Sequence, residues 1–437
     1  MNAPLNKKVV DDICIANGLH NAHELGGATI RQFVSVVSDI ENVTGEHYIR
    51  MEMGVPGLTP SQIGIDAERE AMKTGIAAKY PNITGIDSLK TEAARFLKAF
   101  INLDVSPLCI VPTVGSMQGA FVSLLAVTQM RKERDTVLFI DPGFPVQKQQ
   151  IRVMGAKCDH FDVADFREEK LGPKIESYLQ KGNIAAIIYS NPNNPSWMCL
   201  TDAELRVIGQ LATQYDTVVI EDLAYLNMDF REDRSQPFQP PYQPTVAHYT
   251  DNYMLLLSSS KIFSYAGQRG ALIVMGEKLM SRDFDGFKER YGAGNFGRTL
   301  IHSILYAMSA GVSHSVQYAM AAMFKAANDG VFNYVDQVKE YARRAQRVKE
   351  IMIRNGFHIV YDKDGEEAVG DGFFFTFGYK DMTGEQLINK LIYYGISAIT
   401  LDSTGSARQG LRGCTSNISD SQYEELEKRL KLFSRDY

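Results

Sequence analysis

The chain has 437 residues, of which 45% are hydrophobic and 22% are charged, and its formal net charge is -6 at pH 7. This composition is ordinary for a globular protein, and the length predicts a large domain plus a smaller one rather than one small core. The acidic balance provides no basic surface for nucleic acid or for an anionic membrane, so we expect neither as a partner.

The cysteines and the apolar segments indicate the cellular compartment of the protein. Its five cysteines are scattered and form no C-x-x-C pair, which favours a reducing cytoplasm over a disulfide framework. The first 18 residues contain no apolar stretch of signal-peptide length. The apolar stretch 108–130 is interrupted by Pro112, Gly115 and Gly119, so it predicts a strand, a loop and a buried helix rather than a membrane span. We therefore expect a cytoplasmic protein.

Short apolar runs alternate with helical patterns through the middle of the chain. The runs that predict strands are residues 108–112, 136–140, 185–189, 217–221, 253–257 and 271–275. Helical patterns, such as residues 202–214, lie between most of them. This alternation predicts an α/β fold in which a mostly parallel sheet is covered by helices on both faces. Ligands of such sheets bind at the carboxyl ends of the strands, so the residues that follow each strand are the first candidates for a site.

The last third of the chain has a different pattern. It predicts long helices over residues 298–328 and 331–355, a strand over residues 373–379 and a terminal helix over residues 419–433. We therefore predict a large domain over residues 51–324 and a smaller α+β domain made of residues 1–50 and 325–437. The proline-rich segment 229–249 is interpreted as a surface loop.

The first candidate site follows the first predicted strand. Gly115, Ser116 and Met117 stand between that strand and an apolar helix. The free N–H groups and the dipole of a helix N-terminus bind anions; Gly115 permits close approach and Ser116 adds a hydroxyl. The structural alternative is a glycine turn with Ser116 as the N-cap. A G-x-S-x-G nucleophile motif is excluded, because Gly115 directly precedes Ser116.

Two further candidates follow the next strands along the chain. In the segment 191–195 two X-Pro steps stiffen the loop, so the Asn194 amide can point in a fixed direction and donate to a phenolic oxygen. Asp222 ends a β-branched strand, where a buried carboxylate needs a partner such as a protonated pyridine nitrogen. Taken alone, the first is a plain turn and the second an aspartate that caps the next turn.

Lys261 is the candidate nucleophile. The strand 253–257 runs into Ser258 and two more serines before Lys261, and Arg269 follows eight residues later. Serine hydroxyls and an arginine fork suit an anionic phosphate. A lysine among cationic and apolar neighbours can lose its proton and attack a carbonyl. On its own, a lysine at a strand end is usually a solvated surface residue.

Two other patterns are interpreted as structural. The segment 292–297 matches G-x-G-x-x-G, but a charged, helix-like stretch precedes it and no suitable acidic residue follows, so it predicts a glycine loop rather than a dinucleotide site. His20 and His23 lack further ligands at a credible spacing, so we predict no metal site.

The order and spacing of these motifs resemble the fold-type I pyridoxal-5′-phosphate (PLP) enzymes, and specifically the class I/II aminotransferase family. The similarity runs from about Gly54 to Arg412, and the lysine segment and the Asn-Asn-Pro and Asp-x-x-Tyr motifs are its most specific parts. The resemblance implies that Lys261 forms a Schiff base with PLP, that Asp222 pairs with the pyridinium nitrogen, and that Asn194 and Tyr225 bind the phenolic oxygen.

The resemblance also implies how the rest of the cofactor is held. The residues that would cradle the phosphate are Gly115, Ser116, Met117, Ser258 and Arg269. Phe144 would stack on the ring. Tyr80 is similar to a tyrosine that reaches the phosphate of the other subunit, which implies a homodimer with its sites at the interface.

For the substrate, the resemblance points to the end of the chain. Arg412 looks like the arginine that clamps the α-carboxylate through two parallel hydrogen bonds, with Gly54 and Asn194 beside the substrate. Arg408, four residues earlier, is the nearest competitor, and a solvated surface arginine is the structural alternative. Trp197 stands where the family often has glycine, so it either shapes the substrate pocket or packs.

These observations predict an aminotransferase that moves an amino group between an α-amino acid and a 2-oxo acid. Leu223, Ser196 and Gly270 depart from the family's usual residues, which weakens a subfamily assignment more than the assignment of the cofactor. A carbon–sulfur lyase or another PLP β-lyase remains the alternative, because the lysine, the aspartate and the phosphate loop do not separate the two. A non-catalytic PLP-fold sensor is a remote alternative, since only about 50 residues precede the resemblance and they carry no basic patch.

Overall fold

The computed structural model describes Met1 and residues 3–437, and the chain divides into two compact units. We call residues Thr59–Asn193 with Cys199–Val338 the sheet unit. We call residues Met1–Leu58, Asn194–Met198 and Lys339–Tyr437 the terminal unit. Each unit has its own cluster of buried apolar side chains, as expected for two domains.

A seven-stranded sheet forms the centre of the sheet unit. Its strands are β2 (Ile110–Val114), β3 (Thr136–Asp141), β4 (Lys157–Asp162), β5 (Ile184–Ser190), β6 (Val218–Asp222), β7 (Tyr253–Ser258) and β8 (Gly270–Met275). The order is β2-β8-β7-β6-β5-β3-β4, and only β8 runs against the others. The mostly parallel sheet is therefore confirmed. The sequence missed β4, an edge strand whose first residues are mostly exposed and form no apolar run.

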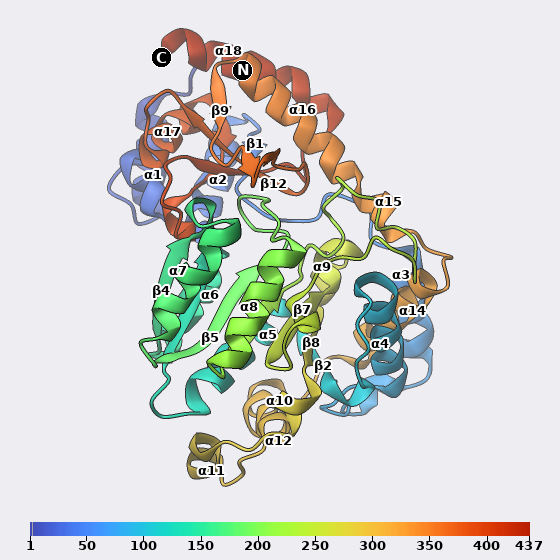
Figure 1. The fold of residues 1–437 in the computed structure, drawn as a ribbon. Helices are drawn as coiled ribbons and strands as arrows, with labels where there is room; N and C mark the ends of the chain where they lie inside the picture. The colour runs from blue at the N-terminus through green and yellow to red at the C-terminus, as the bar shows by residue number, and fades with distance from the viewer. Residues whose placement is uncertain (2) are drawn as a thin grey trace. The chain divides into compact units, whose positions relative to one another are not determined.

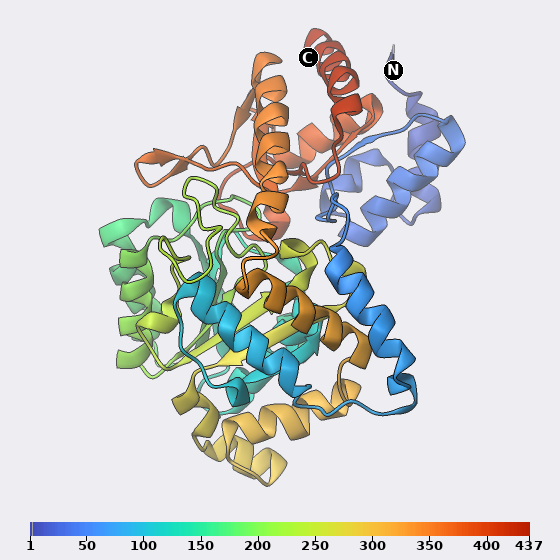
Figure 2. The same cartoon turned by 90° about the vertical axis from the view of Figure 1, so that its right-hand side faces the viewer.

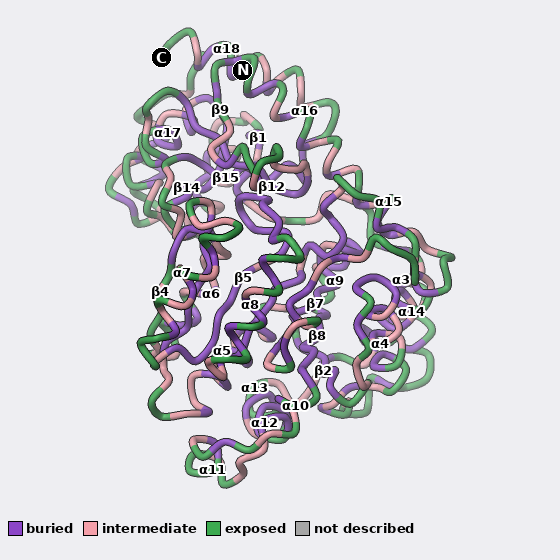
Figure 3. Tube along the Cα trace, in the orientation of Figure 1, coloured by how far each residue is buried: buried purple, intermediate pink, exposed green. Residues whose placement is uncertain are grey.

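Helices cover both faces of this sheet. The helices of the sheet unit are α3 (Gln62–Lys73), α4 (Asp87–Ile101), α5 (Gly115–Gln129), α6 (Pro145–Met154), α7 (Leu171–Leu179), α8 (Asp202–Gln214), α9 (Ser259–Ile262), α10 (Glu277–Ser281), α11 (Asp285–Tyr291), α12 (Phe296–Thr299), α13 (Tyr306–Ser309), α14 (His314–Asn328) and α15 (Tyr334–Val338). In Figure 1, α8 lies in front of the sheet and α5 behind it, where α5 contacts β3, β5, β7 and β8. Figure 3 shows these strands buried along most of their length. Helix α8 has the predicted bounds, and a capping box between Thr201 and Glu204 fixes its start.

The long helix expected over residues 298–328 is wrong. The chain forms α12, a π-helical segment Leu300–Leu305 and α13, and it then breaks before α14. The break occurs where Ala310 and Gly311 take positive φ angles of 52° and 130°. A helix cannot continue through such residues. Helix α14 packs beside α3 and α4, and Figure 2 shows the three as neighbours.

The terminal unit is a smaller α+β unit. Its helices are α1 (Lys7–Ala16), α2 (Ile30–Thr44), α16 (Glu340–Arg354), α17 (Gly384–Leu391) and α18 (Tyr423–Asp436). Its strands are β1 (Ile49–Arg50), β9 (Phe357–Ile359), β10 (Lys363–Asp364), β11 (Glu367–Ala368), β12 (Phe374–Tyr379), β13 (Ile396–Ser397), β14 (Ile399–Thr400) and β15 (Leu411–Cys414). An antiparallel sheet has the order β14-β15-β12-β9, and β1 pairs with β13 in parallel.

The division into units differs from the predicted boundaries in three places. The sheet unit begins at Thr59 instead of residue 51 and continues to Val338 instead of residue 324. It extends further because α14 packs on α3 and α4. The short segment Asn194–Met198 groups with the terminal unit, which no linear pattern in the sequence indicated.

Within the described part of the chain, no helix is long and apolar enough to cross a membrane. The proline-rich segment 229–249 has no helix or strand of its own until a single 3-10 turn at Val246–His248. Its interpretation as a loop is confirmed.

Candidate active site

Lys261 lies on a short helical turn at the carboxyl end of β7. The Oγ of Ser258 accepts from the N–H of Ser260 at 3.2 Å, and the Oγ of Ser259 donates to the carbonyl of Gly270 at 2.7 Å. The first bond caps the start of α9, and the second joins α9 to β8. Lys261 is half-buried, whereas the serine before it and the isoleucine after it are buried. The backbone around the lysine is therefore fixed, while the residue itself remains partly exposed.

Gly115 and Arg269 are brought together by strand pairing. Strands β2 and β8 are antiparallel with Val114 opposite Gly270, so the residues just beyond the pair are neighbours. A Cβ on Gly115 would lie 2.3 Å from the Nη2 of Arg269 and would therefore collide with it. Helix α5 begins directly at Gly115, with φ +70°, so the loop expected between strand and helix is absent from this stretch.

This neighbourhood fits a phosphate. The first N–H groups of α5 have no partner within the helix, and the guanidinium of Arg269 lies against them. Ser116 is half-buried, and the Met117 side chain is partly exposed, so its contribution to an anion would come from the backbone. Since β7 and β8 pair with Ser258 opposite Ala271, the serine lies at this same end of the sheet.

Asp222 ends β6 and is only 6% exposed. Its carboxylate accepts from the backbone N–H of Ala224 at 3.1 Å and from the Nε2 of Gln147 at 2.9 Å. Burial raises the pKa of Asp222 to about 6, against the lowering effect of these two hydrogen bonds. A buried carboxylate with two neutral donors still lacks a cation, and a protonated pyridine nitrogen would supply one.

Three loops converge around Asp222. The N–H of Asn191 donates to the carbonyl of Asp222 at 3.2 Å, which joins the loops after β5 and β6. The Nδ2 of Asn193 donates to the carbonyl of Pro142 at 2.8 Å, which joins the loops after β5 and β3. Phe144 is half-buried and caps α6, whose first turn also carries Gln147. The sequence missed Gln147, although its place one turn beyond the phenylalanine is a signal that could have identified it.

Two more predicted residues of the sheet unit differ strongly in exposure. Tyr225 is buried in the turn after β6, where its carbonyl accepts from the N–H of Met228 at 3.0 Å. Tyr80 is 93% exposed, more than any other large hydrophobic side chain in the described part of the chain. Within one chain, Tyr80 therefore presents its ring to solvent.

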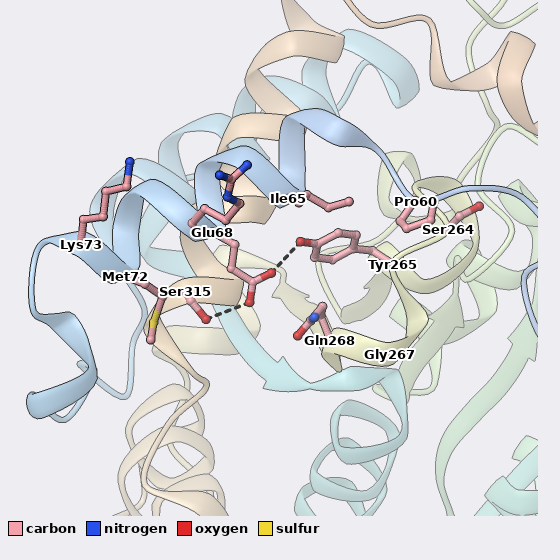
Figure 4. Close-up of a pocket in the computed structure, with 11 residues that line it drawn as sticks. Pro60, Ile65, Glu68, Met72, Lys73, Ser264, Tyr265, Gly267, Gln268 and Ser315 are labelled. Carbon is pink, nitrogen blue, oxygen red and sulfur yellow. Dashed lines mark hydrogen bonds between the residues drawn. The ribbon is translucent and has the colours of Figure 1, made fainter.

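A groove of about 710 Å³ lies beside the residues that follow Lys261. It is lined by residues of α3 and of the segment 264–268, and Figure 4 shows Glu68 between Tyr265 and Ser315. The hydroxyl of Tyr265 donates to Glu68 at 2.6 Å and the hydroxyl of Ser315 donates at 2.9 Å. These bonds join α3, α14 and the lysine segment.

The remaining predicted residues belong to the terminal unit. Arg412, on β15, is 3% exposed; its guanidinium carbon lies 4.8 Å from the centre of the Phe374 ring. Its Nη2 donates to the carbonyl of Glu52 at 2.5 Å. A Cβ on Gly54 would lie 2.9 Å from the Cζ of Phe374, so the structure brings Arg412 and Gly54 to the same aromatic ring.

Arg408 contacts a different aromatic ring of the terminal unit, whereas Trp197 packs against Phe374. The Arg408 guanidinium lies 4.9 Å from the Tyr361 ring and donates to the carbonyl of Val360 at 3.3 Å. Trp197 is 1% exposed and meets Phe374 edge-on at 6.4 Å. A Cβ on Gly372 would lie 2.0 Å from the indole, so Trp197 is closely packed against this glycine. Asn194, also buried, belongs to the same short segment.

In the described residues, no group of three or more His, Cys, Asp or Glu side chains could hold a metal ion. The G-x-G-x-x-G segment follows α11 and runs into α12 rather than coming after a strand of the sheet, so it lacks the context of a dinucleotide site.

Comparisons with known proteins agree on a family. The model of aminotransferase class I and II matches residues 47–430. A probable aspartate aminotransferase of Methanocaldococcus jannaschii is 24% identical over 56% of this chain, and the match spans only 61% of that relative. An LL-diaminopimelate aminotransferase of Natranaerobius thermophilus is 23% identical over 79% of this chain and 83% of its own.

The fold agrees as well. A double mutant of Thermus thermophilus aspartate aminotransferase superposes with a TM-score of 0.74 at 16% identity, covering 94% of this chain and 97% of that one. Such a low identity shows the fold alone. Because the family model spans most of the sequence, the chain belongs to the aminotransferase class I and II family, whose members use pyridoxal phosphate.

Proposed function

We propose that this protein is a PLP-dependent aminotransferase that moves an amino group between an α-amino acid and a 2-oxo acid. The observation that carries the proposal is the arrangement at one end of the parallel sheet. Lys261, Asp222 and the Gly115–Arg269 pair all lie at or beside strand ends of the sheet unit, and the residues present fit the cofactor's amine-reactive, pyridine and phosphate parts.

Each residue of this arrangement has a distinct role. When bound, the cofactor supplies an electron sink that lowers the barrier to removing a proton from the substrate Cα. Lys261 would hold the cofactor through its Nζ until the amine of the substrate takes its place, and the released neutral amine would then take the proton from Cα. Asp222 holds a negative charge where it favours a protonated pyridine nitrogen. Tyr225 and Asn194 donate to the phenolic oxygen.

The phosphate is bound by backbone and side chain together. The N–H groups of Gly115, Ser116 and Met117 and the guanidinium of Arg269 balance its charge, and Ser258 adds a hydroxyl. Phe144 stacks on the ring face.

Arg412 orients the substrate. A planar guanidinium grips a carboxylate through two parallel hydrogen bonds, which fixes the direction of the Cα–H bond. Gly54 leaves room beside the Phe374 ring on which the guanidinium rests.

We also propose that two copies form a dimer with Tyr80 serving the partner's phosphate. Support comes from the 93% exposure of Tyr80 and from the groove of about 710 Å³ next to the lysine segment, both of which a second copy would cover. Light scattering at micromolar concentration should give twice the chain mass, and a fully active monomer would refute the dimer. A cytoplasmic location stays a prediction, which the five free cysteines support.

The test of the activity separates transfer from elimination. Borohydride should fix the cofactor on Lys261, as peptide mapping would reveal. The enzyme should then be supplied with a panel of amino acids and a 2-oxo acid while both the new amino acid and free ammonia are measured. Transfer without ammonia supports the proposal; stoichiometric ammonia with no new amino acid would establish a β-lyase instead.

A further inference from the structure

The guanidinium of Arg412 rests on two supports of different kinds within the terminal unit. Below it lies the ring of Phe374, at 4.8 Å, and beside it lies the carbonyl of Glu52, at 2.5 Å from Nη2. The ring restricts the guanidinium plane through a cation–π contact, and the carbonyl fixes its rotation within that plane. The position of one backbone carbonyl therefore helps to set the direction in which Arg412 presents its other N–H groups.

The backbone that carries this carbonyl is bonded on both sides. The N–H of Ile49 donates to the carbonyl of Gly395 at 2.8 Å, and that of Met51 to the carbonyl of Ser397 at 2.9 Å. On the other side, the N–H of Cys414 donates to the carbonyl of Met51 at 2.9 Å. The segment thus lies between β13 and β15, and Glu52 is the residue at which this support ends.

The side chain of Glu52 continues the support. It is fully buried (0% exposed), and its Oε1 accepts from the Nε of Arg50 at 2.8 Å. The Nη2 of Arg50 lies 2.7 Å from the same oxygen, and Ser397 donates its hydroxyl to Oε2 at 2.6 Å. One carboxylate oxygen therefore accepts from a residue of β1, and the other accepts from a residue of β13.

This ion pair costs free energy that an apolar residue would not. Burying a carboxylate carries a desolvation penalty, and replacing a buried pair by apolar side chains is often neutral or stabilising. What this pair provides is a fixed geometry, since Nε and Nη2 of Arg50 both hold Oε1 while Ser397 holds Oε2. Glu41 contacts a different nitrogen of the same guanidinium, Nη1, at 3.1 Å.

We propose that Glu52 is a positioning residue for the substrate-binding arginine. Its carboxylate, held by Arg50 and Ser397, fixes its own carbonyl, and that carbonyl orients Arg412 for the α-carboxylate of the substrate. The inference rests on the proposed function, because it assumes that Arg412 binds a carboxylate.

The test is a double-mutant cycle in the cofactor-loaded enzyme with Glu52→Gln and Arg412→Lys. Glutamine keeps the size of the side chain but presents an amide N–H₂ to Arg50 or Ser397, both of which are donors here. We expect Glu52→Gln to lower kcat/KM for the amino acid about tenfold and to weaken the binding of unreactive carboxylates, 3-phenylpropionate and succinate, by a similar factor in calorimetric titration. In the Arg412→Lys background the same change should cost less than twofold, since two changes that act through one group are not additive.

Glu41→Gln is the matched control, because it removes a carboxylate from the same Arg50 guanidinium without touching the Glu52 carbonyl. Its kcat/KM should stay within twofold of wild type. Trp197 is the single tryptophan of the chain and packs against Phe374, so an unchanged emission maximum shows that the ring under Arg412 has kept its packing. If Glu52→Gln does not fold, Ser397→Ala removes one donor from the same carboxylate and takes its place in the cycle.

The outcomes separate the two proposals. If Arg412→Lys leaves kcat/KM and carboxylate binding intact, the proposed role of Arg412 fails and the inference fails with it. If Arg412→Lys is impaired but Glu52→Gln is not, or if the two effects are additive, Glu52 does not act through Arg412 and only the further inference is overturned.

Discussion

The two units position their proposed binding groups in different ways. In the sheet unit, strand register places most of these groups: β2, β6 and β7 end at the edge of the sheet where the antiparallel β8 begins, so the residues that flank these strand ends become neighbours. In the terminal unit, Arg412 depends on a carbonyl 360 residues away in sequence and on a buried ion pair. The first arrangement follows from topology, whereas the second depends on individual side chains.

Lys261→Ala is the most severe way to break the sheet-unit arrangement. It removes both the amine that holds the cofactor and the base that takes the Cα proton, so kcat should fall by ~10⁴-fold. Steady-state kinetics and absorbance spectra would measure both losses. A variant with turnover within tenfold of wild type would contradict the assignment of Lys261.

Asp222→Asn should be the next largest change. Asparagine can keep the hydrogen bond from Gln147 but carries no charge for the pyridine nitrogen, so kcat should fall by ~10³-fold. Because burial raises the pKa of Asp222 to about 6, the wild-type carboxylate becomes protonated more readily as pH falls towards that value. Cofactor affinity should therefore weaken as pH drops through about 6 in the wild type.

The asparagine variant should lack that component of the pH dependence. Equilibrium dialysis of pyridoxal phosphate between pH 5 and 8 would compare the two proteins. Parallel affinity profiles would show that Asp222 does not interact with the pyridine nitrogen.

Glu221, which precedes Asp222 on β6, provides a comparison. It tests whether a buried carboxyl group near the end of the same strand affects the free energy of unfolding rather than catalysis. It is fully buried, accepts from the hydroxyl of Thr245 at 2.5 Å and the N–H of Val246 at 3.2 Å, and burial raises its pKa to about 7. A carboxyl whose pKa is raised on folding stabilises the fold below its unfolded value of about 4.5, and this contribution is lost as pH rises through about 7.

Glu221→Gln mimics the protonated acid, so its advantage in unfolding free energy over wild type should grow between pH 5 and pH 8. The change should be on the order of 3 kcal/mol. Urea unfolding of both proteins at the two pH values measures it. An identical pH dependence in the two proteins would mean that Glu221 stays ionised in the fold.

Sequence reasoning located the strands of the sheet unit well. The strands that carry Asp222 and precede Lys261 were predicted within two residues at either end, whereas the roles of these two residues came from the order of the motifs and the resemblance to a family. It failed where structure depends on a local exception, such as the positive φ of Ala310, which ends what looked like one helix. It also could not find the contact between Glu52 and Ser397, because those residues lie 345 positions apart and neither stands in a recognisable motif.

Arg412→Lys examines the terminal unit directly. Lysine keeps the charge but loses the planar fork, so the transition state should lose about 2–3 kcal/mol of stabilisation and kcat/KM should fall ~10²-fold. The affinity for the cofactor should stay unchanged. Arg408→Lys is the matched control, since that side chain is engaged by Tyr361 and Val360. If Arg408→Lys loses activity while Arg412→Lys keeps it, Arg408 is the residue that binds the substrate carboxylate.

Gly115→Ala is the mildest change and tests how strictly the strand register controls the phosphate site. Gly115 has φ +70°, which costs a residue with a side chain about 1–2 kcal/mol. The added methyl group would also lie 2.3 Å from the Nη2 of Arg269, so the guanidinium must move away from the N-terminus of α5. Arg269 is exposed and can change rotamer on its solvent side, so much of the collision can be relieved without disturbing β2 or β8.

The expected result is therefore a rise of about tenfold in the dissociation constant of pyridoxal phosphate, with little loss of kcat once the site is saturated. Gly155→Ala is the matched control, because Gly155 has a similar φ of 69° and nothing within 4 Å of its Cβ position. It carries the same backbone cost without a neighbouring cation, so it should lower stability and leave cofactor affinity unchanged. If both alanine variants bind the cofactor equally well, the contact between Gly115 and Arg269 contributes nothing to holding the phosphate.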